Sequence, residues 1–427
     1  MIIAIVGASG FIGKHLTAYL SAKGHEVICI SRNVISKQEE LALVLSKSRI
    51  VINLAGAPIN QRWTDGNCRV IFDSRVYTTK ILVDAINSLE HKPELFISTS
   101  AVGYYPYNRT VDESWKGSLG GLLSNVTTVW EYEALKVSSD TRLVIMRLGM
   151  VMSFFGGVFP RMFASRRFGV VFTMGSGRQM FPWIDIRDVI RAIEMIISTP
   201  TMKGTYNFVA PERISQNRFV HKVAKHFGCL IHFHVPAFVL KLIMGESSEL
   251  LLKGQSVVPK RLIESGFKYI APQVDDFLRN PDTSTVKNID FNRYVGKWYE
   301  VARYDNRFER GLIMATANYS LVDRYIKIEN AGVEEKTGKY RVAHGKAVVS
   351  KLNGSRLRVS FFPFIYSDYN ILELDETSYS YAVIGSNSYK YLWILSRSPH
   401  LKDEVKQLLL KKLEKRGYDI SQLLWMK

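Results

Sequence analysis

A glycine-rich segment near the amino terminus is the most informative chemical feature of this 427-residue sequence. It directly follows the apolar stretch Ile2–Val6, which is typical of a buried β-strand, and it reads Gly7-Ala8-Ser9-Gly10-Phe11-Ile12-Gly13. Glycines at this spacing allow a tight turn, close approach of the backbone to a pyrophosphate, and close packing of the next helix. The free N–H groups that begin that helix favour phosphate binding. The segment therefore predicts a dinucleotide site.

The residues after the second expected strand, Glu26–Ile30, indicate which dinucleotide binds. Sites that prefer NAD carry an acidic residue here, whose carboxylate accepts a hydrogen bond from the ribose 2′-hydroxyl. This sequence has Ser31-Arg32 instead. A guanidinium next to a hydroxyl suits a 2′-phosphate, so the pair favours NADP. The alternative is that Arg32 is an ordinary solvated arginine.

An acid/base pair is suggested by the spacing Tyr-x-x-x-Lys. That spacing puts a phenol and an ammonium on one helix face, and the ammonium lowers the pKa of the phenol toward neutrality. Tyr132 and Lys136 have this spacing. Tyr19 and Lys23 have it too, but they fall in the expected first helix and cannot be catalytic, so the spacing alone is weak evidence.

The elements that must position these residues fall into two kinds. Up to about residue 150, β-branched runs alternate with helical stretches, which predicts a parallel, doubly wound α/β sheet of the Rossmann type. The expected strands are Ile2–Val6, Glu26–Ile30, Ile50–Leu54, Leu95–Ser98 and Leu143–Arg147. A small substrate lobe is expected within about residues 155–280, so that residues 1–280 form one domain.

Beyond about residue 285 the sequence has short alternating strands, as in an antiparallel barrel, followed by an expected helix, His400–Arg416. Residues 281–288, at a polar stretch that contains Pro281, are expected to be a linker, and residues 289–427 a second, all-β domain. The expected strands are Ala315–Leu321, Tyr325–Glu329, Arg356–Phe361, Tyr369–Leu374 and Tyr391–Leu395.

Composition excludes several classes of protein. With 47% hydrophobic and 22% charged residues and three cysteines, the chain is neither disordered nor a disulfide scaffold, and the cysteines give no metal pattern. No apolar run is long enough to cross a bilayer. Because the first residues lead into the glycine segment without a basic region or a cleavage site, we expect no signal peptide and a cytoplasmic location.

The formal charge of +18 raises the question of nucleic-acid binding. The excess is spread over the chain, with 33 basic against 22 acidic residues up to residue 280 and 24 against 17 beyond it. Without a basic run, specific nucleic-acid binding is disfavoured. The charge instead favours attraction of anionic ligands and peripheral contact with lipid headgroups.

The first 280 residues resemble the atypical, extended short-chain dehydrogenase/reductases of the NAD-dependent epimerase/dehydratase-like family. Besides the glycine segment, the resemblance depends on Val51–Pro58, Asp73–Val76, Ser98–Tyr105, Gly175–Gln179 with Pro182–Ile184, Asn207–Pro211 and Gly254–Arg261. It implies that Leu54, Ala55 and Gly56 lie along the adenosine–ribose path and that Arg75 reaches the cofactor. It also implies that Met180–Trp183 and Arg178 shape a substrate pocket.

The resemblance assigns Ser100 to the strand end where the superfamily keeps a catalytic serine or threonine, which would polarise a carbonyl or hold an alcohol and also contact the cofactor. The alternative is that this hydroxyl only satisfies backbone groups. Aligning Trp130-Glu131 with the family's Trp-Glu puts Leu123 and Thr127 where tyrosine and lysine would stand. Tyr104 is then a proton-donor candidate comparable with Tyr132 and Lys136.

The last 140 residues resemble the lipocalins, and closely the bacterial lipocalins related to apolipoprotein D. The motifs are Gly296-Lys297-Trp298-Tyr299, Arg303–Gly311, Val359–Phe362, Ser367–Asn370 and Leu392–Arg397. An eight-stranded barrel that holds a fatty acid or lysophospholipid is implied. Trp298 would plug the closed end under Arg397. Residues expected to line the barrel, with core packing as the equal alternative, are Trp298, Phe364, Tyr366, Tyr381 and Trp393.

Together these features predict an NADP(H)-dependent oxidoreductase or epimerase-like enzyme that acts on a small, hydrophobic substrate, fused to a lipid-binding barrel. A non-catalytic NADP(H)-binding sensor or scaffold joined to a lipid carrier is the alternative. The sequence leaves open whether the two domains act on a common compound or independently.

Overall fold

The computed structural model describes residues 1–107, 109–117, 121–287, 289–323, 325–349, 354–362, 364–388 and 390–426. The chain divides into two compact units, residues Met1–Arg279 and Asn280–Lys427. Each unit is described separately below.

The first unit is built on a six-stranded parallel sheet with the order β11-β6-β4-β3-β1-β2. The order reverses direction between β1 and β3, as in doubly wound sheets that bind a ligand at the carboxyl ends of their strands. The predicted Rossmann-type sheet is therefore confirmed. Its strands are β1 (Ile2–Val6), β2 (Glu26–Ile30), β3 (Ile50–Asn53), β4 (Leu95–Ala101), β6 (Arg142–Leu148) and β11 (Gly204–Phe208).

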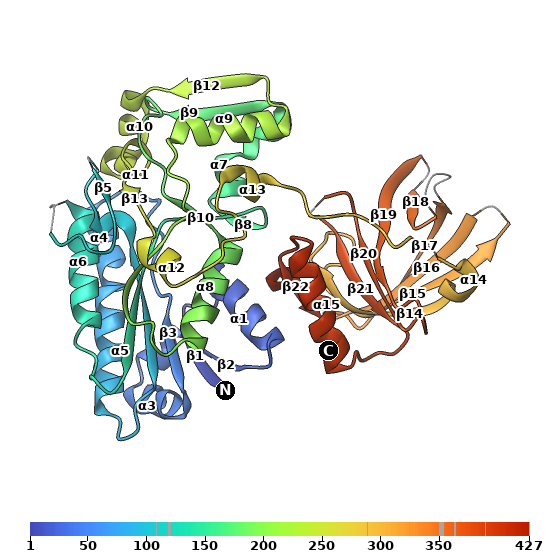
Figure 1. Ribbon diagram of the computed structural model, residues 1–427, viewed down its shortest axis with the longest axis horizontal. Coiled ribbons are helices and arrows are strands. Elements are labelled where there is room, and N and C mark those ends of the chain that lie inside the picture. Colours follow the sequence, from blue (N-terminus) through green and yellow to red (C-terminus); the bar gives the residue numbers. More distant parts are fainter. Residues whose placement is uncertain are drawn as a thin grey trace. The chain divides into compact units, whose positions relative to one another are not determined.

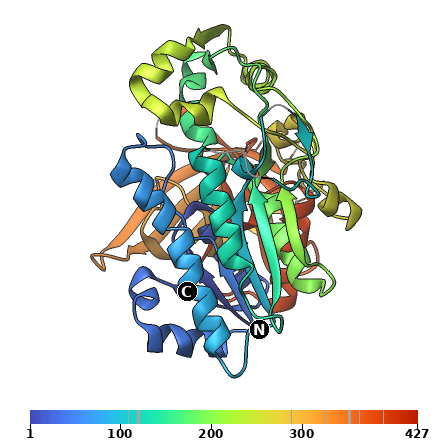
Figure 2. The same ribbon diagram turned by 90° about the vertical axis from the view of Figure 1, so that its left-hand side faces the viewer.

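Helices cover both faces of this sheet (Figure 1). Figure 2 shows α5 (Val76–Ser88) and α6 (Leu122–Ala134) side by side across one face, where the Trp130 indole donates a hydrogen bond to Thr79 Oγ1. On the other face, Tyr19 and Lys23, at the end of α1 (Phe11–Ala22), both contact Glu194 of α8 (Ile186–Ser198). Tyr19 and Lys23 thus tie two helices together, which agrees with their exclusion from catalysis.

The small lobe of the first unit has a separate apolar core. It contains the two-stranded sheet of β9 (Val170–Met174) and β12 (Ile231–Val235), together with α9 (Gln216–Phe227) and α10 (Ala237–Met244). Phe181 and Trp183 are 5% and 1% exposed within this core. The resemblance implied that these two side chains shape a substrate pocket. In the structure they are instead packed inside the apolar core of the lobe.

The second unit is a closed antiparallel barrel, as predicted. Strands β14 to β21 pair in sequence, β21 also pairs with β14 to close the barrel, and the short β22 (Leu423–Trp425) pairs with the last residues of β14. Helix α15 (Asp403–Lys415) packs along the outside (Figure 1), where Lys412 binds Glu373. The barrel strands are β14 (Gly296–Tyr304), β15 (Leu312–Val322), β16 (Tyr325–Glu334), β17 (Tyr340–Val349), β18 (Arg356–Phe362), β19 (Ile365–Leu374), β20 (Tyr381–Gly385) and β21 (Leu392–Ser396).

One end of the barrel is closed by the short helix α14 (Phe291–Tyr294) and by Trp298, which is fully buried. The Arg397 guanidinium lies 3.9 Å from the Trp298 ring centroid and donates hydrogen bonds to backbone carbonyls, including those of Tyr294 and Lys297. The predicted stack of Arg397 on Trp298 is confirmed. The guanidinium donates to backbone carbonyls that would otherwise lack a hydrogen-bond donor at the closed end of the barrel.

Candidate functional site

The glycine segment forms a loop that only glycine can build at two positions. Gly7 has a φ of +80°, and a Cβ there would lie 2.8 Å from the Leu54 carbonyl oxygen. A Cβ on Gly13 would lie 2.3 Å from the Gly7 carbonyl oxygen. The loop and α1 are thus packed backbone to backbone.

The tip of this loop is free to meet a ligand. Ser9 and Gly10 are exposed, and Gly10 precedes α1 without a side-chain cap. The first N–H groups of a helix have no partner within the helix, and the helix dipole makes this end attractive to anions. The Phe11 ring lies over Gly156 and Gly157, where an added Cβ would come within 2.7 to 3.1 Å. Ile12 is partly buried in the first turn of the helix.

Two further segments flank the glycine loop. Leu54 and Ala55 follow β3 and lie against Gly7, because a Cβ on Gly7 would come within 3.1 Å of their backbone. On the other side, Ile30 at the end of β2 pairs with Val6 at the end of β1, and Ser31 and Arg32 follow it. The structure thus brings these predicted residues to one edge of the sheet.

The Arg32 side chain is exposed and has no hydrogen-bond or ion-pair partner within the described ranges. Ser31 is partly engaged, because its Oγ accepts a long hydrogen bond from the Val34 N–H at the start of the short α2 (Arg32–Ile35). The residues present therefore fit a dinucleotide with a 2′-phosphate. The glycine loop leaves room that Cβ atoms would fill, the first N–H groups of α1 have no side-chain cap, and the Arg32 guanidinium is available to bind a phosphate.

The Arg75 guanidinium is held by hydrogen bonds within the protein. It donates to the carbonyls of Ala57 and Ile71, and its guanidinium lies 5.5 Å from the Trp130 ring. A Cβ on Gly56 would lie 3.1 Å from it. Burial lowers the pKa of Arg75 to about 10, still well above neutrality. Its contacts shape the loop after β3, where the resemblance had implied a reach to the cofactor.

Ser100, the last residue but one of β4, lies beside a buried ion pair that sequence reasoning missed. Its hydroxyl donates a 2.6 Å hydrogen bond to Glu131 Oε1 on α6. The Arg147 guanidinium on the neighbouring strand β6 binds both oxygens of Glu131 at 2.7 Å. All three residues are at most 6% exposed. Because its proton points at Glu131, Ser100 presents lone pairs, and it is suited to accept a hydrogen bond from an alcohol.

The ion pair extends into a longer buried network. Arg147 Nη1 donates to the Tyr105 hydroxyl, which donates to Asn207 Oδ1 at 2.8 Å. Burial raises the pKa of Tyr105 to about 12 although Arg147 opposes this shift. The pKa of Arg147 is lowered by burial, but the hydrogen bond and the charge of Glu131 raise it by more, so the net shift is upward. Arg147 therefore stays a cation.

Tyr104 lies against the same cation. The Arg147 guanidinium carbon is 3.5 Å from the Tyr104 ring centroid, and Tyr104 belongs to the single turn η1 (Val102–Tyr104) that follows β4. Tyr104 is half-buried, whereas Tyr105 is buried. A phenol in this position can reach a ligand at the carboxyl end of β4.

Tyr132 and Lys136 meet each other but no other candidate. The Lys136 ammonium is 4.5 Å from the Tyr132 ring and pairs with Glu133. The Tyr132 side chain is 61% exposed. The reason is the helical period: Glu131 turns toward Ser100, so its neighbour in sequence turns to solvent.

Leu123 and Thr127 occupy the place facing the Ser100 strand end. A Cβ on Gly103 would lie 3.3 Å from Leu123 Cβ and 3.9 Å from Thr127 Cγ2. This contact agrees with the alignment that put these two residues at the usual tyrosine and lysine positions. Thr127 Oγ1 is used within the helix, where it donates to the Leu123 and Ser124 carbonyls.

The barrel interior contains only part of the predicted lining. Trp393 on β21 pairs with Ile384 of the barrel core and therefore faces inward, and Trp298 lies at the closed end. Tyr366 stands three positions before the inward-facing Tyr369 on β19, so alternation places it outside, where it lies near Arg358. Tyr381 likewise lies outside, next to the inward Ala382.

Phe364 does not line the interior either. It occupies the turn between β18 and β19 with a φ of +65°, and 98% of its surface is exposed. The expectation for Phe364, Tyr366 and Tyr381 failed because any aromatic residue in a barrel strand fits a lining until the register of that strand is known.

Polar groups also face the barrel interior. The hydroxyls of Tyr294 and Tyr319 each lie within 2.9 Å of the Tyr369 hydroxyl, and burial raises the pKa of all three phenols. Farther toward the open end, Arg303 pairs with Glu300, and both are buried. The Nε of Arg303 is buried without a partner among the described residues.

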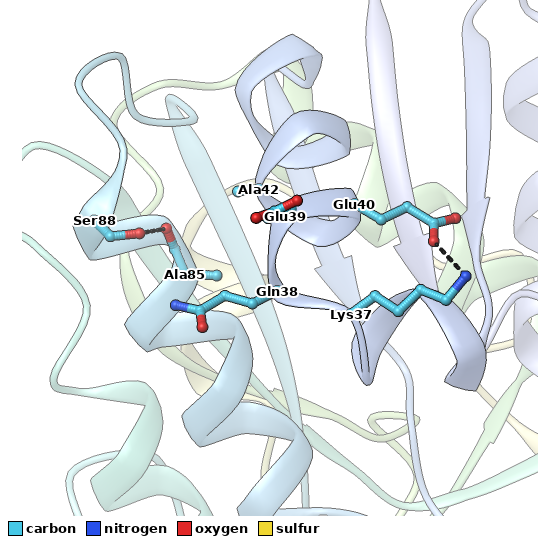
Figure 3. Close-up of a pocket in the computed structure, with 7 residues that line it drawn as sticks. All are labelled: Lys37, Gln38, Glu39, Glu40, Ala42, Ala85 and Ser88. Carbon is cyan, nitrogen blue, oxygen red and sulfur yellow. Dashed lines mark hydrogen bonds and ion pairs between the residues drawn. The ribbon is translucent and has the colours of Figure 1, made fainter.

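A separate surface hollow lies between α3 (Gln38–Lys47) and the last turns of α5 (Figure 3). Because α5 leads into β4, its last residue, Ser88, is near the amino-terminal edge of the sheet, opposite to the glycine loop. Lys37 and Glu40, three residues apart at the start of α3, pair at 3.3 Å. We assign this hollow no role. It is lined by Lys37, Gln38, Glu39, Glu40, Ala42, Ala85 and Ser88.

Comparison with protein families divides the chain in the same way. Residues 3–208 match the NAD dependent epimerase/dehydratase family, residues 235–280 a domain of unknown function (DUF1731), and residues 289–427 a lipocalin-like domain. The predicted fusion of these two architectures is confirmed. No helix within the described ranges is long and apolar enough to span a membrane.

Individual relatives cover the first unit. An epimerase family protein of Staphylococcus saprophyticus is 34% identical over 284 residues, which are 63% of this chain and 95% of that protein. Epimerase family protein SDR39U1 of Mus musculus is 33% identical over 292 residues, 66% of this chain and 99% of that protein.

Solved structures give the same result. The structure of human epimerase family protein SDR39U1 with NADPH matches with a TM-score of 0.61 and 31% identity, and covers 65% of this chain and 98% of that one. A UDP-glucuronic acid 4-epimerase from Bacillus cereus matches with a TM-score of 0.54, covering 65% of this chain and 96% of that one. At 18% identity it shows the fold alone.

Proposed function

The chain belongs to the NAD dependent epimerase/dehydratase family, and from this premise we propose that its first unit is an NADP(H)-dependent oxidoreductase or epimerase-like enzyme. The observation that carries the proposal is the glycine loop with the unpartnered Arg32 beside it. The structure of human SDR39U1 with NADPH supports the choice of cofactor.

In this proposal the backbone of Gly7, Ser9, Gly10, Phe11, Ile12 and Gly13 holds the pyrophosphate at the start of α1. Arg32, with Ser31, holds the 2′-phosphate, and Leu54 and Ala55 line the path between them. Arg75 and Gly56 keep that path in shape. NADP(H) supplies or accepts a hydride at its nicotinamide when bound.

Ser100 and Tyr104 act on the substrate. A substrate hydroxyl donates to Ser100 Oγ, whose own proton is held by Glu131, so a proton can pass from the substrate through Ser100 toward the carboxylate. The two hydrogen bonds from Arg147 hold the Glu131 carboxylate in place. Tyr104 is the remaining proton donor at this end of β4. Tyr132 and Lys136 take no part, because they face solvent.

One observation favours the second candidate, a non-catalytic NADP(H) sensor: the positions that face the Ser100 strand end hold Leu123 and Thr127, not an acid/base pair. The variant Ser100→Ala separates the two. NADPH oxidation is measured with a panel of fatty aldehydes, and Tyr132→Phe serves as the control. An enzyme loses at least about tenfold in rate through Ser100→Ala alone, whereas a sensor has no turnover to lose with any substrate.

For the second unit we propose binding of a fatty acid or lysophospholipid inside the barrel. The apolar core below and the unpartnered Arg303 Nε above suit a ligand with a long chain and one polar acceptor group. Displacement of a fluorescent fatty acid from the full chain tests this. Trp393→Ala is expected to weaken binding and Tyr381→Ala, on the outer face, to leave it unchanged.

We further propose that the protein works in the cytoplasm. All three cysteines, Cys29, Cys68 and Cys229, are free thiols. Thiols remain reduced in that compartment. Fractionation of cells that produce the tagged chain tests the location.

A further inference from the structure

Exposed apolar side chains gather at the open end of the barrel. Because the strands alternate in direction, the segments that follow β14, β16 and β18 all lie at the end opposite to Trp298. We define the rim as six residues of these segments and the adjoining strand ends. They are Phe308 (59% exposed), Met314 (69%), Tyr340 (68%), Phe362 (62%), Phe364 (98%) and Ile365 (65%).

Two rim residues have a positive φ, a backbone conformation that residues with bulky side chains rarely adopt. Phe364 has a φ of +65° and Met314 a φ of +53°. This left-handed region suits glycine or asparagine and disfavours bulky residues. At both positions the backbone is therefore strained, and a large apolar side chain is exposed to solvent. Within the folded unit neither residue gains burial in return, which points to a contact outside the chain.

Cations stand among the apolar residues of the rim. Arg307, Lys336 and Lys339 are exposed. Arg307 lies 4.7 Å from the Phe308 ring, and no described carboxylate pairs with these three side chains. The rim also has paired charges, Arg310 with Asp305 and Arg341 with Glu334. The charge of Lys336 also acts on the Glu334 carboxylate, whereas Arg307 and Lys339 contribute to the overall charge of +18.

We propose that the rim docks on an anionic lipid bilayer. Aromatic and long apolar side chains flanked by Lys and Arg are typical of segments that lie in the headgroup region, where the apolar tips leave water and the cations meet anionic lipid. Docking at this end brings the open mouth of the barrel to the bilayer. The inference goes beyond ligand binding inside the barrel, and the two can fail separately.

The test is flotation of the full chain with vesicles of phosphatidylcholine alone or of equal parts phosphatidylcholine and phosphatidylglycerol. The double variant Phe364→Asn, Met314→Asn removes both tips and keeps a residue that tolerates positive φ, so the barrel still folds. Leu321→Asn with Tyr325→Asn, exposed residues at the closed end, is the matched control. A third variant, Phe238→Asn with Leu242→Asn, removes an exposed apolar surface on α10 of the first unit.

We expect binding to the mixed vesicles, weaker binding to phosphatidylcholine alone, and release by salt. The rim variant is expected to lose at least about tenfold in vesicle affinity, and the other two variants to bind like the wild type. Any of three flotation results overturns the proposal: no binding to mixed vesicles, equal binding by the rim variant, or loss of binding through the α10 variant alone. A rim that pairs two copies in sedimentation, without vesicle binding, also overturns it.

A parallel measurement keeps this proposal distinct from lipid binding inside the barrel. Fluorescent fatty-acid displacement without vesicles is expected to be unchanged in the rim variant. If the wild type binds vesicles but no fatty acid, docking stands and the proposed ligand is wrong. If the wild type binds fatty acid but no vesicles, the proposed ligand stands and docking is wrong.

Discussion

Glu131 and Arg147 are joined by two parallel hydrogen bonds of 2.7 Å inside the first unit, and Ser100 donates to the same carboxylate. A buried pair of this kind is a weak source of stability in itself, but removal of one partner leaves the other charged and unpaired. The pair therefore orients the Ser100 hydroxyl. Substitutions that remove one of the two charges are expected to destabilise the first unit.

Glu131→Ala is accordingly expected to destabilise the first unit by about 3 kcal/mol, because Arg147 would keep its charge in a buried site. Lys136→Ala breaks the half-exposed ion pair with Glu133 and the contact with the Tyr132 ring, and is expected to cost less than about 1 kcal/mol. Urea unfolding followed by the helical circular dichroism signal measures both. Equal losses in the two variants would contradict the importance of the buried pair.

Gly13→Ala is expected to disrupt the glycine loop. The new methyl would lie 2.3 Å from the Gly7 carbonyl oxygen, so the loop must shift, at a cost of about 1–3 kcal/mol and with loss of NADPH affinity. Gly66→Ala is the control, because a Cβ there meets nothing within 4 Å. Thermal unfolding with and without NADPH measures the effect. A Gly13→Ala protein that NADPH stabilises as it does the wild type would show that the loop does not hold the cofactor.

The stability of the barrel is expected to fall as pH rises toward 8. Burial, and then the charge of Glu309, raise the pKa of Glu300 to about 8, although Arg303 opposes the shift. Between its ordinary value and about 8, the folded barrel keeps a proton that the unfolded chain has lost, so the free energy of unfolding decreases with pH in that window. Glu300→Gln removes this proton exchange.

Scanning calorimetry of the wild type and of Glu300→Gln across that window checks the expectation. The difference in Tm between the variant and the wild type should grow in favour of the variant as pH rises. Parallel profiles of the two proteins would place the titration of Glu300 outside this window.

Much of the fold follows from local patterns. The β-branched runs locate five of the six strands of the parallel sheet to within three residues at each end, because the central strands are buried and bounded by turn residues; the edge strand β11 was not predicted. The glycine loop is equally local: its seven residues fix both the turn and the helix start. The placement of Arg397 on Trp298 also follows from the motifs that contain them.

Long-range contacts account for what the sequence did not reveal. Glu131 was noticed only as part of an alignment with Trp130, since its partner Arg147 is on another element. One signal was present: Ser124, Thr127 and Glu131 form a polar row on the buried face of α6. In the barrel, Tyr366 and Tyr381 were misplaced because their facing depends on register, which local composition does not set.

Arg32→Ala is expected to weaken NADPH binding by at least about tenfold and to leave NADH binding unchanged, because only NADPH has the 2′-phosphate that a charge-assisted bond would hold. Arg49→Ala is the matched control, an exposed arginine paired with Glu94. Calorimetric titration gives both affinities. Equal NADPH affinities in the two variants would remove Arg32 from the site.

The most direct test of the central claim is calorimetric titration of the intact, unmodified chain with NADPH and with NADH. If the glycine loop and Arg32 form a 2′-phosphate-selective site, NADPH binds saturably and NADH binds at least about tenfold more weakly. Absence of binding by either nucleotide, or equal affinity for both, would contradict the account.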